Sequence, residues 1–260
     1  MPIKGVPEVR AGDDLVSLLL SAAARYNVKI ENEDVLVIKQ KVVSKAEGMV
    51  LNLDTVKPDE KARDIAREQK RDPRVVEIVL RESKRIIKIG DGVIITQTRH
   101  GFVCLNAGLD RSNVEKNHVA LLPDDSDRSA REIRKKIRKA TGKKVAVIIT
   151  DTFSRPWRKG QVDFAIGYSG IGPLLSYIGQ RDNHGNKLKV TETAIADEIA
   201  AAAELVSGKL SRVPIVVVRG LRYRKYARSI RQLLVEPEKD LFRLKYALDK
   251  TDNSVQILNP

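Results

Sequence analysis

The chain has 260 residues, and its 48 lysines and arginines outnumber its 34 aspartates and glutamates, so its formal net charge is +14. This positive charge favours anionic partners such as nucleotides, polyphosphates, nucleic acid or acidic substrates. The single cysteine, Cys104, excludes an intramolecular disulfide and fits a reducing compartment. The sequence contains no 18-residue apolar run and no signal-peptide core, so we expect a soluble cytoplasmic protein without membrane partners.

Hydrophobic periodicity predicts alternating helices and strands in the first half of the chain. We expect a helix over residues 15–26, a short buried strand over 34–38, and exposed helices over 59–85 that break at Asp72 and Pro73. Two strands, 93–98 and 100–104, are expected to form a hairpin that leads into a turn containing glycine.

The second half of the chain repeats this alternation. It predicts a basic helix over residues 129–140, a strand over 145–149, an alanine-rich helix over 191–206 and a strand over 214–220. Strands that alternate with helices indicate an α/β fold with a layered sheet. We therefore expect one domain over residues 1–236, followed by a charged C-terminal extension over 237–260 that forms a helix or a tail.

The most informative segment follows the apolar run at residues 145–149. Asp151 and Thr152 come at the expected end of this strand, and Arg155, Trp157 and Arg158 follow them closely. A carboxylate and a hydroxyl are ligands for hard metal ions, while arginines suit phosphate or carboxylate groups. Open α/β sheets bind ligands beyond the carboxyl ends of their strands. The alternative is that Asp151 and Thr152 only cap a turn.

A second carboxylate lies in the turn-forming segment 106–113. Asp110 offers oxygen ligands and Asn113 can donate and accept hydrogen bonds, although the same residues are typical of an Asx turn. Asp110 and Asp151 together would form a magnesium or manganese site that phosphate oxygens complete. The three histidines are scattered along the chain, and one cysteine cannot build a zinc site.

Several basic residues are candidate contacts for an anion, although each is also compatible with a solvated surface. The set comprises Lys41, Lys45, Arg155, Arg158 and Lys159, and the residues around Lys45 indicate a turn beside a strand. The basic stretches 128–144 and 219–231 could bind nucleic acid, but a solvated helix face is the better interpretation of the first stretch. The chain has no Walker A motif, no dinucleotide fingerprint and no nucleophile elbow.

Many short segments, taken together and in order, resemble the family of GTP-dependent coenzyme F420:gamma-L-glutamyl ligases. The resemblance covers most of the chain, from about Gly5 to about Val235. The segments that carry it are 5–9, 12–15, 42–48, 100–104, 106–110, 112–114, 121–123, 150–161 and 196–206.

The resemblance implies an enzyme that uses GTP and a divalent metal ion, Mn²⁺ or Mg²⁺, to attach L-glutamate to coenzyme F420-0. Further glutamates are added through gamma-linkages, each step passes through an acyl phosphate, and GDP and phosphate are released. The implied fold is an unusual layered α/β arrangement in an intertwined homodimer, with K⁺ as a further ion. Nucleic acid is not expected among its partners.

The resemblance also implies roles for individual residues. The metal ligands would be Asp110, Asp151 and Thr152. GTP would be held by Val6, Pro7, Glu8, Val9, Gln40, Lys45, Asn113, Val206, Ser207, Gly208 and Lys209. The candidates for substrate binding are Arg155, Arg158 and His100, and the general base is left unassigned among Glu8, Asp151 and His100.

Two positions depart from the family pattern. Gln40 stands where a serine is usual, and Lys209 aligns with a position where relatives carry a glutamine ligand for a second metal ion. Two other functions remain open from the residues alone. One is a related GTP-dependent ligase that acts on another phosphorylated acceptor, and the other is a basic nucleic-acid-binding protein.

Overall fold

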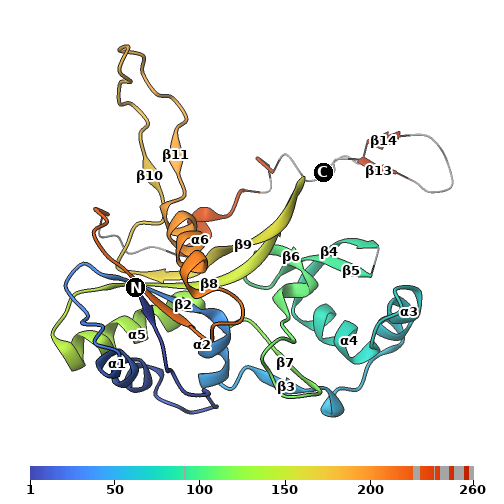
Figure 1. Cartoon of the computed structure of the whole chain (residues 1–260). Helices are drawn as coiled ribbons and strands as arrows, with labels where there is room; N and C mark the ends of the chain where they lie inside the picture. Colours follow the sequence, from blue (N-terminus) through green and yellow to red (C-terminus); the bar gives the residue numbers. More distant parts are fainter. Residues whose placement is uncertain (91, 225–228, 237, 241–245, 249–254, 258–260) are drawn as a thin grey trace.

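A computed structural model describes residues 1–90, 92–224, 229–236, 238–240, 246–248 and 255–257. Its centre is a five-stranded sheet with the strand order β1-β12-β2-β8-β9 (Figure 1). The strands are β1 (Pro2–Ile3), β12 (Ile215–Val218), β2 (Val35–Lys39), β8 (Ala146–Arg155) and β9 (Arg158–Ser169). Within the described ranges, no helix is long and apolar enough to cross a membrane.

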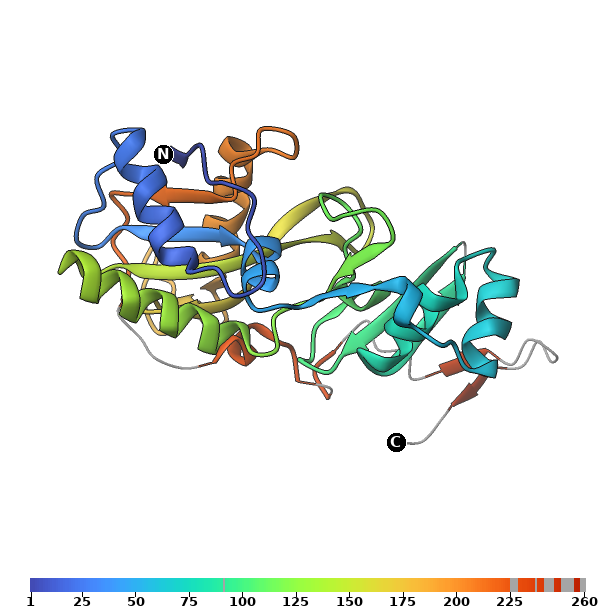
Figure 2. The same cartoon turned by 90° about the horizontal axis from the view of Figure 1, so that it is seen from below.

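Strands β2 and β8 form the parallel centre of this sheet, with Val35 opposite Ala146 and Lys39 opposite Thr150. Their apolar residues are buried on both faces because helices cover both faces of the sheet. Helices α1 (Leu15–Arg25) and α5 (Ser126–Thr141) pack on one face, and α6 (Ile195–Ser207) packs on the other (Figure 2). The α/β fold expected from the sequence is confirmed.

Helix α5 is longer than the expected helix over residues 129–140 because its first turn is capped. The Asp125 carboxylate accepts a hydrogen bond from the backbone N–H of Arg128, and Gly142 ends the helix in the left-handed conformation. The start of the helix lies directly against β9, where a Cβ on Gly167 would come within 2.4 Å of the Ser126 backbone. Only glycine permits this close approach.

A smaller part of the molecule, built from residues 49–121, lies beside the end of the main sheet (Figure 2). It contains the antiparallel pair β3 (Val50–Asn52) and β7 (His118–Ala120), and the three-stranded sheet β4 (Ser83–Gly90), β5 (Val93–Thr98) and β6 (Val103–Leu105). Helices α3 (Glu60–Glu68) and α4 (Pro73–Arg81) and the 3₁₀ turns η1 (Leu53–Thr55) and η2 (Asn106–Gly108) complete it.

The sequence interpretation was wrong at one boundary in this part. The helices expected over residues 59–85 end at Arg81, and β4 begins at Ser83. Ile86 and Ile89 pair with Thr96 and Ile94 of β5, so the hairpin with β5 decides the local structure against the helical periodicity of the charged residues. The break at Asp72 and Pro73 is confirmed, since Asp72 caps α4 and Pro73 is its first residue.

Strand β8 does not end at Asp151, as the sequence suggested, but continues to Arg155. Its partner β9 pairs with it along this length, from Val147 opposite Ser169 to Arg155 opposite Arg158. Pro156 and Trp157 form the turn of this long hairpin, and Trp157 has φ of 55°. Asp151 and Thr152 are therefore strand residues, because β9 pairs with the backbone of β8 beyond the apolar run.

Two further elements differ from the sequence predictions. The segment at 191–194 is not helical: β11 (Glu192–Thr193) pairs with β10 (Leu175–Ser176) at the base of a projecting arm, and α6 starts at Ile195 (Figure 1). Lys45 lies in helix α2 (Gln40–Ala46), not in a turn.

The end of the chain was expected to be a charged extension that forms a helix or a tail. The described residues after 240 form the antiparallel pair β13 (Tyr246–Leu248) and β14 (Val255–Ile257), and the other residues after 240 lie outside the described ranges. Before this pair, the 3₁₀ turn η3 (Ile230–Leu233) packs against the main core.

Candidate functional site

The structure brings Asp110 from the smaller part of the molecule toward Asp151 on β8. Asp110 is held in place by a bridge to Ala120, whose backbone N–H and C=O both pair with it. Burial acts to raise the pKa of Asp110, but hydrogen bonds from Lys41 and from the backbone of Ser112 outweigh it, so this pKa lies below its usual value. Asp110 is therefore ionised at neutral pH.

Asp151 behaves in the opposite way. Burial raises the pKa of its carboxyl to about 7, and the negative charges of Asp110 and Asp163 add to this effect. The charge of Lys209 and a hydrogen bond from the backbone of Thr152 only partly offset it. A bound cation beside Asp151 and Asp110 would relieve the repulsion between these two carboxylates.

This donor set fits a hard cation better than a soft one. No group of three or more histidine, cysteine, aspartate or glutamate side chains arranged to hold a metal ion occurs among the described residues. Two carboxylates therefore need further oxygen ligands from a bound phosphate or water, as Mg²⁺ and Mn²⁺ commonly have. Cys104 is excluded as a thiolate ligand, since burial and the charge of Asp151 raise its pKa to about 12.

Helix α2 presents two lysines, one turn apart, to the loop after Asp110. The Lys41 Nζ lies 2.7 Å from Asp110 Oδ2 and 2.5 Å from the carbonyl oxygen of Ser112. Lys45 donates to the carbonyl oxygen of Asn113 at 2.7 Å and pairs with Glu8. The structure thus gathers Glu8, Lys45 and Asn113, three of the residues expected to hold GTP.

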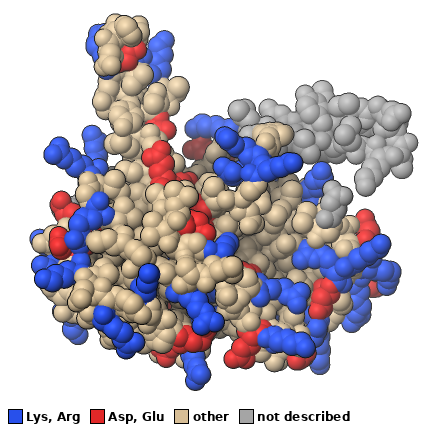
Figure 3. All heavy atoms as spheres, in the orientation of Figure 1, with Lys and Arg blue, Asp and Glu red and all other residues tan. Residues whose placement is uncertain are grey.

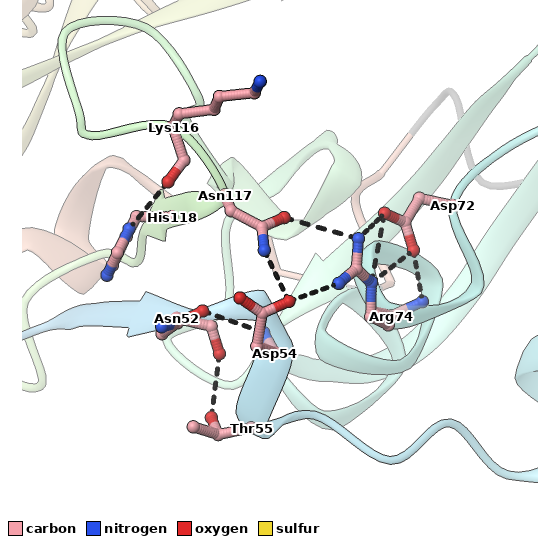
Figure 4. A network of polar contacts seen from close by, with 8 residues as sticks. All are labelled: Asn52, Asp54, Thr55, Asp72, Arg74, Lys116, Asn117 and His118. Atoms are coloured by element: carbon pink, nitrogen blue, oxygen red, sulfur yellow. Dashed lines mark hydrogen bonds and ion pairs between the residues drawn. The ribbon is translucent and has the colours of Figure 1, made fainter.

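The base of this loop is fixed by a polar network shown in Figure 4. Arg74 of α4 donates to Asp54 at 2.9 Å and pairs with Asp72 at 2.8 Å, while the amide of Asn117 donates to Asp54 at 2.5 Å. The side-chain oxygen of Asn117 also accepts from Arg74. Both ends of the segment from Asp110 to Asn117 are therefore tied to regular elements.

Four other residues expected to hold GTP lie in the N-terminal loop and at the start of α2. Val6 and Val9 pack against the main core, while Pro7 is exposed beside Glu8. Gln40 is only 2% exposed and donates to the Leu121 carbonyl oxygen at 2.6 Å and to Ser44 Oγ at 2.9 Å. The structure therefore does not bring the Gln40 amide to the surface with the others, and its GTP contact stays a prediction without geometric support.

The end of α6 reaches the site from the other face of the sheet. Val206 is exposed, Ser207 is buried, and Gly208 ends the helix with φ of 58°. After this turn the Lys209 Nζ donates to Thr152 Oγ1 at 2.9 Å. Lys209, Thr152 and Asp151 are thus neighbours.

The three candidates for substrate binding are not gathered at one place. Arg155 and Arg158 flank the turn of the β8–β9 hairpin, where Arg155 donates to the Lys159 carbonyl oxygen at 3.2 Å. His100 instead lines a separate cavity of about 740 Å³, together with Phe102, Tyr168, Arg99, Arg128, Arg131 and Arg231. Burial, followed by the charge of Arg99, lowers the pKa of His100, so the ring is neutral at pH 7.

An aromatic series lies between the cavity and the end of β8. Phe102 lines the cavity and lies with its ring centroid 6.2 Å from that of Phe153, which lies 6.0 Å from that of Phe164. Phe153 belongs to the same strand as Asp151, and Phe164 is paired with Asp151 across the hairpin. The ring contacts thus run from the arginine-lined cavity to the strand that carries Asp151.

Comparisons with known proteins identify the family of the chain. The sequence matches the family described as F420-0:Gamma-glutamyl ligase over residues 4–220. The chain belongs to this family of F420-0:gamma-glutamyl ligases. The family resemblance seen in the sequence is confirmed, and with it the expectation of a ligase.

Relatives of the ligase come from several archaea. It is 43% identical to the coenzyme F420:L-glutamate ligase of Methanothermobacter thermautotrophicus over 93% of this chain and 97% of that protein. The protein of the same name from Methanopyrus kandleri is 44% identical over 93% of this chain and 96% of its own length. The one from Methanocaldococcus jannaschii is 45% identical over 82% and 86%.

Sequence reasoning missed three charged residues of the ligase behind Thr152. Asp163 of β9 is 1% exposed, and it pairs with Lys39 at the end of β2, which also pairs with Glu204 of α6. The available signal was Asp163 itself, a carboxylate followed by the apolar residues 164–166 on a strand. A buried carboxylate in such a position requires partners.

The basic stretches of the chain are described only in part, and acidic residues neutralise some of their charge. Arg219 pairs with Asp34 and Glu31, and residues 225–228 of the second stretch lie outside the described ranges. On the face shown in Figure 3, basic and acidic side chains are interspersed over most of the surface. This pattern is typical of a solvated, mixed-charge surface.

Proposed function

We propose that this protein is a GTP- and divalent-metal-dependent ligase that adds L-glutamate to coenzyme F420-0 and then adds further gamma-linked glutamates. Family membership and relatives named coenzyme F420:L-glutamate ligase support the substrates. The observation that carries the metal and GTP is the approach of Asp110 and Asp151, beside a helix that presents Lys41 and Lys45.

The chemistry of the reaction explains why such a site is needed. A carboxylate acylates an amine poorly, so it is first converted to an acyl phosphate by transfer of the terminal phosphoryl group of GTP. The glutamate amine then attacks the acyl carbon, phosphate leaves, and an amide bond forms. A bound Mn²⁺ or Mg²⁺ would neutralise the charge on the phosphate oxygens during transfer. K⁺ is proposed as a further ion.

The residues of the chain have separable tasks in this proposal. Asp110 and Asp151 would hold the divalent ion, with Thr152 as a third oxygen ligand. Lys41 and Lys45 now pair with acidic and carbonyl groups, and they would turn to phosphate oxygens when GTP binds. Arg155, Arg158 and His100 are proposed to contact the anionic groups of the coenzyme.

A homodimer in the cytoplasm is part of the proposal. The arm based on β10 and β11 projects from the body of the molecule (Figure 1). It carries Val190, which is 85% exposed, and Ile178, which is 53% exposed. Apolar side chains on a projecting arm support burial against a second copy of the chain.

The decisive experiment incubates the purified protein with GTP, MnCl₂, L-glutamate and coenzyme F420-0 and measures product masses. Mass gains of one or more glutamyl units, with matching GDP release, support the proposal. GDP release with a different phosphorylated acceptor but none with F420-0 would favour a related ligase. Tight, steeply salt-dependent binding of DNA or RNA without any GTP turnover would favour the nucleic-acid function.

A further inference from the structure

The hydroxyl of Thr152 has a fixed hydrogen-bond polarity. Its Oγ1 lies 2.7 Å from Asp163 Oδ1 on one side and 2.9 Å from the Lys209 ammonium on the other. A carboxylate can only accept and an ammonium can only donate. Thr152 must therefore donate its single proton to Asp163 and turn its lone pairs toward Lys209.

The Asp163 side chain is in turn held in place by its own contacts. Its Oδ2 accepts from the Thr150 hydroxyl at 3.0 Å and from the Lys39 ammonium at 2.5 Å. Lys39 is also paired with Glu204, whose carboxylate accepts from the buried Ser207 hydroxyl at 3.0 Å. Asp163 itself is buried, on the strand against which α6 packs, and it cannot turn away from Thr152 without losing Lys39.

We infer that Asp163 is a positioning residue that makes the Thr152 hydroxyl a ligand for a cation, and that Lys209 occupies this ligand position in the metal-free protein. The inference rests on the proposed metal site and adds two roles to it. Asp163 accepts the hydroxyl proton of Thr152, so this proton points away from the proposed cation position. A hydroxyl polarised in this way is a better electron-pair donor to a cation. Lys209 is a tethered cation that competes with the metal ion.

Substituting Asp163 by asparagine tests the first role without changing the shape of the side chain. Its single amide oxygen would be held by Lys39, so the amide NH₂ would face Thr152 and donate to it. The Thr152 hydroxyl would then accept, and its proton would point toward the cation. We expect Asp163→Asn to weaken Mn²⁺ binding about tenfold or more, as loss of a group behind a metal ligand typically does.

Lys209→Met tests the second role and should have the opposite sign. Removing the ammonium frees the Thr152 lone pairs and removes a positive charge beside Asp151, so Mn²⁺ should bind severalfold more tightly. Mn²⁺ alone is titrated into the full-length protein, and free Mn²⁺ is followed by electron paramagnetic resonance. GTP and activity are not needed for this readout.

Two further variants separate positioning from general damage. Asp197→Asn is the matched control, because Asp197 accepts a backbone hydrogen bond from Ala165 at the same interface of α6 and β9, and it should bind Mn²⁺ like the unmodified protein. Thr152→Val removes the hydroxyl. Adding Asp163→Asn to it should then cause no further loss of Mn²⁺ affinity, since Asp163 acts through Thr152.

The outcomes distinguish this inference from the metal site itself. If Asp151→Asn abolishes Mn²⁺ binding but Asp163→Asn binds Mn²⁺ normally, the metal site stands and the role of Asp163 is overturned. The role of Asp163 would also be overturned if Asp163→Asn lowered the Mn²⁺ affinity equally in the unmodified protein and in the Thr152→Val variant. Weaker binding in Lys209→Met would show that Lys209 does not compete, and normal binding in Asp151→Asn would remove the metal site altogether.

Discussion

The two halves of strand β8 differ sharply although β9 pairs with both. Residues 146–149 are apolar and completely buried, whereas the half that begins at Asp151 carries partly exposed polar, charged and aromatic side chains. The first half stabilises the fold through burial on both faces. The second half has the same backbone support but carries the residues of the proposed metal site, so a single strand contributes to both the core and that proposed site.

The largest expected effect comes from Asp151→Asn in the second half. Loss of this carboxylate should lower the rate of GDP release by on the order of a thousandfold, because the phosphoryl transfer loses electrostatic stabilisation. The fold should remain intact, which circular dichroism checks. Normal turnover by this variant would contradict the difference between the two halves of β8, because the half that begins at Asp151 would then have only a structural role.

The next effect is expected in the first half. Ile148 is completely buried at the centre of the main core, so Ile148→Ala should lower the free energy of unfolding by about 2–5 kcal/mol. Urea denaturation measures this loss. The folded fraction should release GDP at nearly the normal rate, and a comparable loss of activity per folded molecule would show that the two halves are not separable.

The folding stability of the metal-free protein should depend on pH through Asp151, in the second half of β8. The pKa of Asp151 rises from 3.8 to about 7 on folding, so between these values the folded state keeps a proton that the unfolded state has lost. This contribution to stability is complete below pH 4 and disappears as the pH rises through 7. The stability of the unmodified protein should therefore fall relative to Asp151→Asn over this range.

Thermal unfolding of both proteins in EDTA at pH 5 and pH 8 measures this difference. The relative gain of Asp151→Asn at pH 8 should be on the order of 2 kcal/mol, because partial exposure screens part of the shift. Asp197→Asn serves as a comparison for the effect of the amide substitution. An equal midpoint difference between the unmodified protein and Asp151→Asn at both pH values would contradict the raised pKa.

The smallest effect is expected at the hairpin turn. Trp157 is 83% exposed, so Trp157→Ala should change the free energy of unfolding by only about 0.5 kcal/mol. A loss several times larger, measured by urea denaturation, would identify Trp157 as a packing anchor. An unchanged stability with a raised KM for the coenzyme would instead indicate a platform for a ring.

The sequence was sufficient for the α/β class and most of its elements because the apolar runs of β2, β8 and β12 are unambiguous. It failed where long-range pairing decides the local structure. Residues 83–90 are rich in charge and read as helix, but pairing with β5 makes them a strand. Residues 151–155 have no apolar run, yet β9 extends the strand through them.

The site was predictable only in part for the same reason. Asp110, Asp151 and Thr152 were recognisable in short motifs, and the structure brings them together. Asp163, Lys39 and Glu204 were missed because their meeting depends on the pairing of β8 with β9 and on the packing of α6. Conversely, the sequence placed His100 and Arg155 together, although one lines a cavity and the other lies at a hairpin turn.

The parallel pairing of β2 with β8 also has a kinetic consequence. It joins segments separated by more than a hundred residues, and Lys39 and Thr150 form the last pair of its register. The chain loses conformational entropy when it closes a loop of this size, before the new contacts stabilise it. This order slows folding. The end of the strand that is proposed to bind a cation should therefore form late in folding, so metal ions would bind the folded molecule and would not direct its folding.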